Sequence, residues 1–211
     1  MASPRTATSY ALLGLLAVRA WTTYELAKQV GRSLHWFWPR AERKLYDEPK
    51  QLVAAGLATA SRERTGNRPR TVYAITEEGR AALRDWLSEP PAPPSMESEA
   101  VLKVFFSDAG SLEQLGATLD RMEEDSAARV DVLASMAGMP PAESEFPARL
   151  HLSALLLSLQ LDQELATLRW TRWARHQVSA WRGTDDPGAW DPPAVLAALA
   201  ERARREVPSR T

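Results

Sequence analysis

The basic side chains between residues 40 and 70 are the residues of this sequence whose types and spacing best suit binding to a ligand. Guanidinium and ammonium groups bind phosphate oxygens through charge-assisted hydrogen bonds, and arginine also binds a guanine edge through two parallel bonds. Eight basic residues lie in this span against four acidic ones: Arg40, Arg43, Lys44, Lys50, Arg62, Arg64, Arg68 and Arg70. They predict a surface for a polyanion, although a solvated helix and a soluble hairpin would have a similar composition.

The net charge of −1 conceals an uneven distribution. Residues 1–88 contain 14 basic and 8 acidic residues, a net charge of +6, whereas residues 89–211 contain 12 and 19, a net charge of −7. Positive charge is therefore concentrated in the part of the chain that contains the basic span. This favours a polyanionic partner for that part, and ordinary scatter of surface charge is the other interpretation.

Three short helices and a hairpin are predicted around the basic span. Apolar periodicity and capping residues favour helices over residues 9–19, 24–30 and from Pro39 to the residue before Pro49. Strand-like runs at 57–64 and 70–76 flank a five-residue connection with Gly66 and Asn67, which is typical of a hairpin. A fourth helix follows Thr76. This order is that of a winged helix-turn-helix, in which the third helix enters the major groove and the hairpin reaches the flanking backbone.

Pro49 interrupts the predicted third helix. An interior proline costs roughly 3 kcal/mol unless the helix bends. We therefore expect a kink near Glu48, with base contacts confined to Arg40, Arg43 and Lys44 on the turns before it, and Lys50 beyond the kink.

A proline-rich segment divides the chain. Four prolines occur among the eight residues 88–95, which excludes a regular helix or a central strand there. We expect a winged helix-turn-helix over 1–88, a joint at 89–95 and an all-helical domain over 96–211. The predicted fold class is α+β, mainly α.

A long helix predicted up to residue 182 is apolar on two faces, so it must be covered from two sides. We expect a homodimer in which one face, with Leu150, Ala154, Leu157, Leu161, Leu165 and Leu168, lies in the interface. The alternative is a helix at the centre of a monomeric bundle.

The nearly opposite face of the same helix becomes rich in tryptophan towards its end. Trp170 and Trp173, with Arg172 nearby, suit a pocket for a small hydrophobic or aromatic effector. Aromatic residues on a helix are more often part of a core or an interface, so this pocket is a hypothesis.

Several short segments, in order, are similar to one known family. They are Ser9 to Leu16, Thr23 to Leu26, Phe37 to Pro39, Leu45-Tyr46, Leu52 to Leu57 and Val72 to Arg80. They resemble the PadR family of bacterial transcriptional regulators, and the proline joint followed by helices resembles its longer subgroup. The resemblance implies an operator-reading third helix, a hairpin that is the wing, a dimer built by the C-terminal helices, and DNA-contacting tyrosines at Tyr24 and Tyr46.

An enzyme is not expected from this sequence. The chain has no cysteine and three separated histidines, and it contains neither a metal-protease motif nor a phosphate-binding glycine loop. No cofactor or metal is predicted. No apolar run is long enough for a membrane span, so we expect a cytoplasmic protein.

The sequence therefore predicts a homodimeric repressor that binds a pseudo-palindromic operator. Its expected DNA-binding residues are Tyr24, Arg40, Arg43, Lys44, Tyr46, Lys50, Arg62, Arg64, Asn67, Arg68 and Arg70. The alternative is a winged-helix adaptor that binds another protein and has no sequence-specific DNA binding.

Overall fold

The computed structural model describes residues 5–38, 45–65 and 68–206, and the chain divides into two compact units, residues 1–94 and 95–211. The first unit combines helices with a small antiparallel sheet, and the described part of the second contains helices only. The predicted α+β, mainly α, fold class is confirmed.

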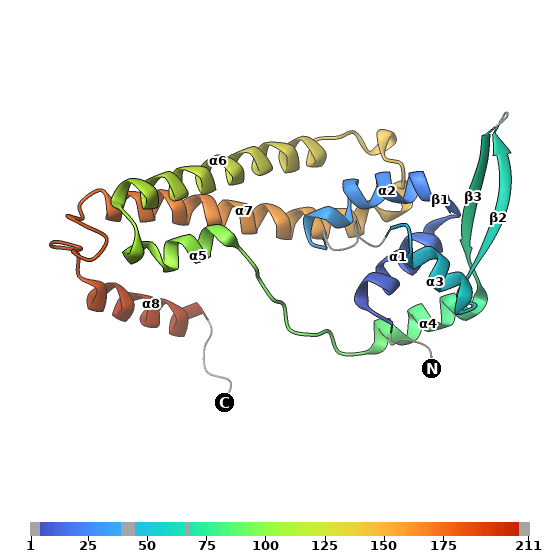
Figure 1. Cartoon of the computed structure of the whole chain (residues 1–211), viewed down its shortest axis with the longest axis horizontal. Coiled ribbons are helices and arrows are strands. Elements are labelled where there is room, and N and C mark those ends of the chain that lie inside the picture. The colour runs from blue at the N-terminus through green and yellow to red at the C-terminus, as the bar shows by residue number, and fades with distance from the viewer. Residues whose placement is uncertain (1–4, 39–44, 66–67, 207–211) are drawn as a thin grey trace. The chain divides into compact units, whose positions relative to one another are not determined.

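The first unit has the element order of a winged helix-turn-helix (Figure 1). Its elements are α1 (Ala7–Val18), β1 (Trp21–Thr22), α2 (Thr23–Arg32), the 3-10 helix η1 (Leu34–Trp36), α3 (Glu48–Ala54), β2 (Ala58–Thr65), β3 (Arg68–Ile75) and α4 (Glu77–Ser88). The sheet order is β1-β3-β2, with both pairs antiparallel. The two residues of β1 pair with Val72 and Tyr73 of β3.

The core of this unit forms around α1, whose sequence is apolar on nearly every side. The helix contacts α3, α4 and β3, so it needs apolar residues in several directions. Leu12, Leu13 and Leu16 are fully or almost fully buried. On its outer side, the ring of Tyr10 stacks on Trp86 of α4, with 4.9 Å between the ring centroids.

Two glycines allow the close connection between α3, the hairpin and α4. Gly56 has a φ of +73°, a left-handed conformation that favours glycine directly after a helix. Gly79 lies in the first turn of α4, and a Cβ atom there would stand 2.1 Å from the Leu57 carbonyl oxygen. The hydroxyl of Thr76 accepts a hydrogen bond from the Gly79 N–H and donates one to the Gly56 carbonyl, which joins the two turns.

The second unit is built on an antiparallel pair of long helices (Figure 1). Its elements are α5 (Glu99–Phe105), η3 (Ser107–Ala109), α6 (Leu112–Ala137), η4 (Pro141–Glu143), η5 (Pro147–Arg149), α7 (Leu150–Val178) and α8 (Pro192–Glu206). Leu119 and Leu133 of α6 and Thr171 of α7 are almost completely buried. Ion pairs also join the two long helices, among them Arg129 with Glu164 at 2.9 Å.

Candidate nucleic-acid interface

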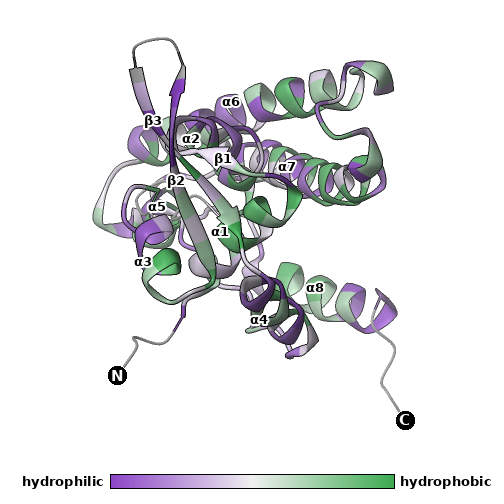
Figure 2. Ribbon diagram, turned by 90° about the vertical axis from the view of Figure 1, so that its right-hand side faces the viewer, coloured by the Kyte–Doolittle hydropathy of each residue, from purple (hydrophilic) through white to green (hydrophobic). Residues whose placement is uncertain are grey.

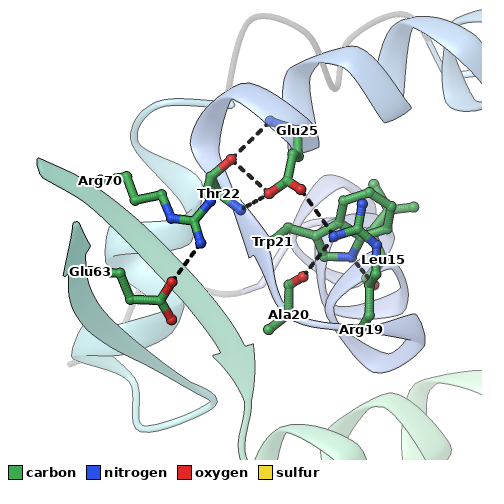
Figure 3. A network of polar contacts seen from close by, with 8 residues as sticks. All are labelled: Leu15, Arg19, Ala20, Trp21, Thr22, Glu25, Glu63 and Arg70. Atoms are coloured by element: carbon green, nitrogen blue, oxygen red, sulfur yellow. Dashed lines mark hydrogen bonds and ion pairs between the residues drawn. The ribbon is translucent and has the colours of Figure 1, made fainter. Parts of the chain in front are cut away.

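The start of α2 is positioned by a capping box. The Thr22 hydroxyl accepts a hydrogen bond from the Glu25 N–H, and the Glu25 carboxylate accepts one at 2.7 Å from the Thr22 N–H (Figure 3). The hydrogen bonds that the Thr22 N–H and hydroxyl donate to the Glu25 carboxylate, together with the nearby Arg19 guanidinium, hold the pKa of Glu25 below its usual value. Arg19 also lies over the ring of Trp21 at 3.6 Å, and this supports the short connection between α1 and β1, directly before α2.

Tyr24 lies in the first turn of α2, and its side chain is 77% exposed. A large aromatic side chain in that position contributes little to the core of its own unit. It is therefore free to contact a ligand with both its ring and its hydroxyl group.

The start of α3 is anchored by a buried polar contact. Glu48 is only 4% exposed, and its carboxylate accepts a hydrogen bond from the hydroxyl of Ser9 on α1. Pro49 follows in the first turn of the helix, where a missing N–H costs nothing. The expected kink at an interior proline is therefore wrong, because a helix begins at Glu48 and residues 45–47 form a turn.

Two predicted contact residues flank this helix start. Tyr46 is 69% exposed and lies two residues before the start of α3. Lys50 is exposed on the first turn of α3, and its ammonium group lies 3.5 Å from the carboxylate of Asp47. The structure thus brings Tyr46 and Lys50 to one end of α3.

The β2–β3 hairpin separates its cations onto two faces. Side chains alternate along a strand, so Arg62 and Arg64 lie on one face of β2 and Glu63 lies on the other. Register places Glu63 opposite Arg70, and their side chains form an ion pair at 2.8 Å (Figure 3). Arg62 and Arg64 are exposed and form no ion pair or hydrogen bond with any residue that the structure describes. Figure 2 shows that the outer part of the hairpin is hydrophilic.

Some predicted contact residues lie outside the described part of the chain. They are Arg40, Arg43, Lys44 and Asn67, together with the side chain of Arg68, whose backbone belongs to β3. Their DNA contacts remain predictions.

The sequence-based analysis missed the groups that anchor this surface. Glu48 was counted only as a charge opposing the basic residues, although it is buried against Ser9. The indole N–H of Trp38 donates to the Thr8 hydroxyl at 3.0 Å, which holds the aromatic segment after η1 to the start of α1. Neither pair could be found from sequence spacing, because its partners are 39 and 30 residues apart.

The two apolar faces of α7 differ in burial within the second unit. On the face assigned to the dimer, Leu168 is buried, Leu150, Leu157, Leu161 and Leu165 are half-buried, and only Ala154 is exposed. On the other face Leu152, Leu155, Leu156 and Leu159 are between 39% and 70% exposed. The protomer itself thus partly covers the face that was assigned to a partner, and the place of that face in a dimer stays a prediction.

The predicted effector residues are only partly brought together. Trp170 and Trp173 line a cavity beside α5 and α6, whereas Arg172 does not. The Arg172 guanidinium instead forms an ion pair with Glu123 of α6 at 2.8 Å. Hydrogen bonds from Arg172 and Arg175 hold the pKa of Glu123 below its usual value.

The described residues contain no cluster of histidine and carboxylate side chains that could hold a metal ion. In the same residues, no helix is both long and apolar enough to cross a membrane.

Comparison with known proteins agrees with this architecture. Residues 12–85 match the model of the "Transcriptional regulator PadR-like family". The Negative transcriptional regulator PadR of Bacillus subtilis (strain 168) is 27% identical over 168 residues, which cover 76% of this chain and 91% of that protein.

Two solved structures of the Bacillus subtilis protein share the fold. Its complex with operator DNA has a TM-score of 0.70 at 22% identity, covering 82% of this chain and 99% of that one. Its complex with p-coumaric acid has a TM-score of 0.63 at 24% identity, with the same coverage. Residues 12–85 of this chain therefore form a domain of the PadR-like family of transcriptional regulators.

Proposed function

We propose that this chain is a DNA-binding transcriptional repressor that acts in the cytoplasm as a homodimer on a pseudo-palindromic operator. The observation that carries the proposal is the exposure of Tyr24, Tyr46, Lys50, Arg62 and Arg64 on the winged helix-turn-helix unit. None of these side chains contributes to a buried core, and all are of types that contact phosphates or bases. The similar Bacillus subtilis protein is named a negative regulator and is seen with operator DNA, which supports the same role here.

Within this interface we assign Arg62 and Arg64 to the phosphate backbone. Phosphate contacts supply affinity without reading sequence, and exposed cations that have no acidic neighbour suit that task best. Base contacts are assigned to Arg40, Arg43 and Lys44, which come before Tyr46 in the chain. Asn67 and Arg68, at the tip of the wing, complete the proposed backbone contacts.

The dimer is proposed to use the exposed face of α7. Leu152, Leu155, Leu156 and Leu159 repeat at the i, i+3, i+4, i+7 spacing of a helix face that packs on another helix. A second copy of the chain presents the same face, so the two can meet about a two-fold axis. A two-fold dimer would place two recognition helices about 34 Å apart on a pseudo-palindromic operator.

We further propose that a small molecule controls DNA binding. The similar Bacillus subtilis protein has been crystallised with p-coumaric acid, a small aromatic molecule, which supports this form of control. A ligand that binds one conformation of the dimer better than another would shift the population, and so the operator affinity.

The decisive experiment is footprinting and gel-shift titration on the DNA upstream of the gene, repeated at about 50 and 200 mM salt. A regulator protects a discrete symmetric site and keeps a preference for it at the higher salt concentration. A winged-helix adaptor would show only weak binding to every sequence, and this binding would collapse as salt rises.

The dimer is tested separately with Leu155→Glu, since this side chain is 70% exposed and its replacement leaves the protomer core intact. Sedimentation should show a dimer for the unchanged protein and a monomer for the variant. A monomeric unchanged protein would refute the two-fold arrangement.

A further inference from the structure

A cavity in the second unit lies where α5, η3, α6 and the end of α7 meet. Its volume is about 180 Å³, and four tryptophans line it: Trp170, Trp173, Trp181 and Trp190. Its floor belongs to the core cluster of Leu115, Leu119 and Ala174. An apolar cavity of about 150 Å³ in another protein accommodates benzene, so this one has room for a single aromatic ring with small substituents.

Two buried hydrogen-bond donors belong to the wall of this cavity. The indole nitrogens of Trp181 and Trp190 are buried, and neither has a partner among the described residues. The two rings contact one another, with centroids 5.3 Å apart. An indole N–H can only donate, and a buried donor without an acceptor is costly, so an oxygen atom entering between the rings would be favoured.

The residues that line the cavity also disfavour a charged ligand. None of the described residues that line it is charged. The nearby arginines of α7 are engaged elsewhere, because Arg172 pairs with Glu123 and Arg175 with Asp120 and Glu123. A carboxylate would therefore lose its hydration without gaining a cationic partner, whereas a carbonyl oxygen needs only the donors that are present.

We propose that this tryptophan-lined cavity binds a small uncharged aromatic molecule with a carbonyl oxygen. The ring lies among the four indoles, and the oxygen accepts hydrogen bonds from Trp181 and Trp190. Trp190 belongs to the connection between α7 and α8, where Gly188 adopts a φ of +63°.

An apolar side chain from a second copy is the competing occupant. It would fill the volume, but it would leave both indole donors without an acceptor. The cavity chemistry therefore favours a ligand with an oxygen atom over a leucine or phenylalanine from a partner.

This cavity is a binding site for the small-molecule control proposed above. Ligand binding to the cavity does not depend on that proposed function, whereas an effect of the ligand on DNA binding does. Val104 of α5 lines the cavity, and α5 begins shortly after the proline segment that connects the two units. A ligand in the cavity can thus shift the conformation of α5, the first helix after the proline segment.

The test uses the purified full chain without DNA and three probes of similar size: acetophenone, ethylbenzene and benzoate. Binding is followed by ligand-observed saturation-transfer NMR and by tryptophan fluorescence. Acetophenone should bind about tenfold more tightly than ethylbenzene, which has no acceptor, and than benzoate, which is charged.

Trp190→Phe and Trp181→Phe keep an aromatic ring and remove one donor each. Each should reduce the preference for acetophenone over ethylbenzene several-fold and leave ethylbenzene binding unchanged. Trp86→Phe, in the first unit, is the matched control and should change neither affinity.

Equal affinity for the three probes would overturn the proposed ligand chemistry. Absence of binding of all three probes would overturn the site itself. A chain that binds acetophenone but protects no operator would refute the regulatory function and leave the cavity assignment standing.

Discussion

The salt dependence of operator binding provides a direct test of how the hairpin uses its arginines. Each phosphate contact releases counterions and contributes about 0.9 to the slope of log K against log [salt]. Arg64 is exposed and has no acidic partner among the described residues, whereas Arg70 is paired with Glu63 at 2.8 Å. Arg64→Ala should therefore remove one contact from each protomer, and a dimer on a two-fold site should lose about 1.8 from its slope.

This change in slope corresponds to a large difference in measured affinities. Between 50 and 200 mM salt, the affinity of the unchanged protein should fall roughly twelvefold more than that of Arg64→Ala. Fluorescence anisotropy with a labelled operator at four salt concentrations gives both slopes.

Arg70→Ala is the matched control, because its charge is already compensated by Glu63 and its loss should change the slope much less. The assignment of the two hairpin faces would be refuted if Arg70→Ala lowered the slope by about 1.8 and Arg64→Ala left it unchanged.

Three further predictions concern stability. Gly79→Ala should destabilise the first unit by about 1–3 kcal/mol in urea unfolding, because the new Cβ would meet the Leu57 carbonyl oxygen, whereas Gly14→Ala, with open space around it, should be neutral or stabilising. Ser9→Ala should cost about 1–3 kcal/mol, since the buried Glu48 carboxylate loses its hydroxyl donor, and an unchanged unfolding midpoint would contradict that role. The pKa of Glu123 is lower in the folded protein than its usual value of 4.5, so its contribution to stability is present above that pH and is lost as the pH falls through the folded value. Thermal unfolding between pH 3 and 7 should show a shallower acid loss for Glu123→Gln, and identical profiles would rule out this contribution.

Local sequence was sufficient for the helices and strands that follow from short-range rules. Apolar periodicity predicted α1 and α7, the turn residues predicted the hairpin, and a helix was correctly expected after Thr76, which caps α4. These features depend on side-chain pattern, capping and turn conformation within a few residues, so they can be read without knowledge of distant partners.

Tertiary structure decided which of these residues are available to a ligand. Glu48 is buried and Pro49 begins a helix because Ser9 lies against α3, and no local rule places a residue from position 9 there. Strand register pairs Arg70 with Glu63 and leaves Arg62 and Arg64 unpaired among the described residues, so that similar cations acquire different roles. Packing on α6 covers part of one apolar face of α7 and leaves the other exposed. The two faces are similarly apolar, so the sequence alone could not show which of them is covered. Sequence thus determined the elements and their chemistry, and contacts between distant segments determined which side chains remain exposed, because burial and pairing depend on neighbours that lie far away along the chain.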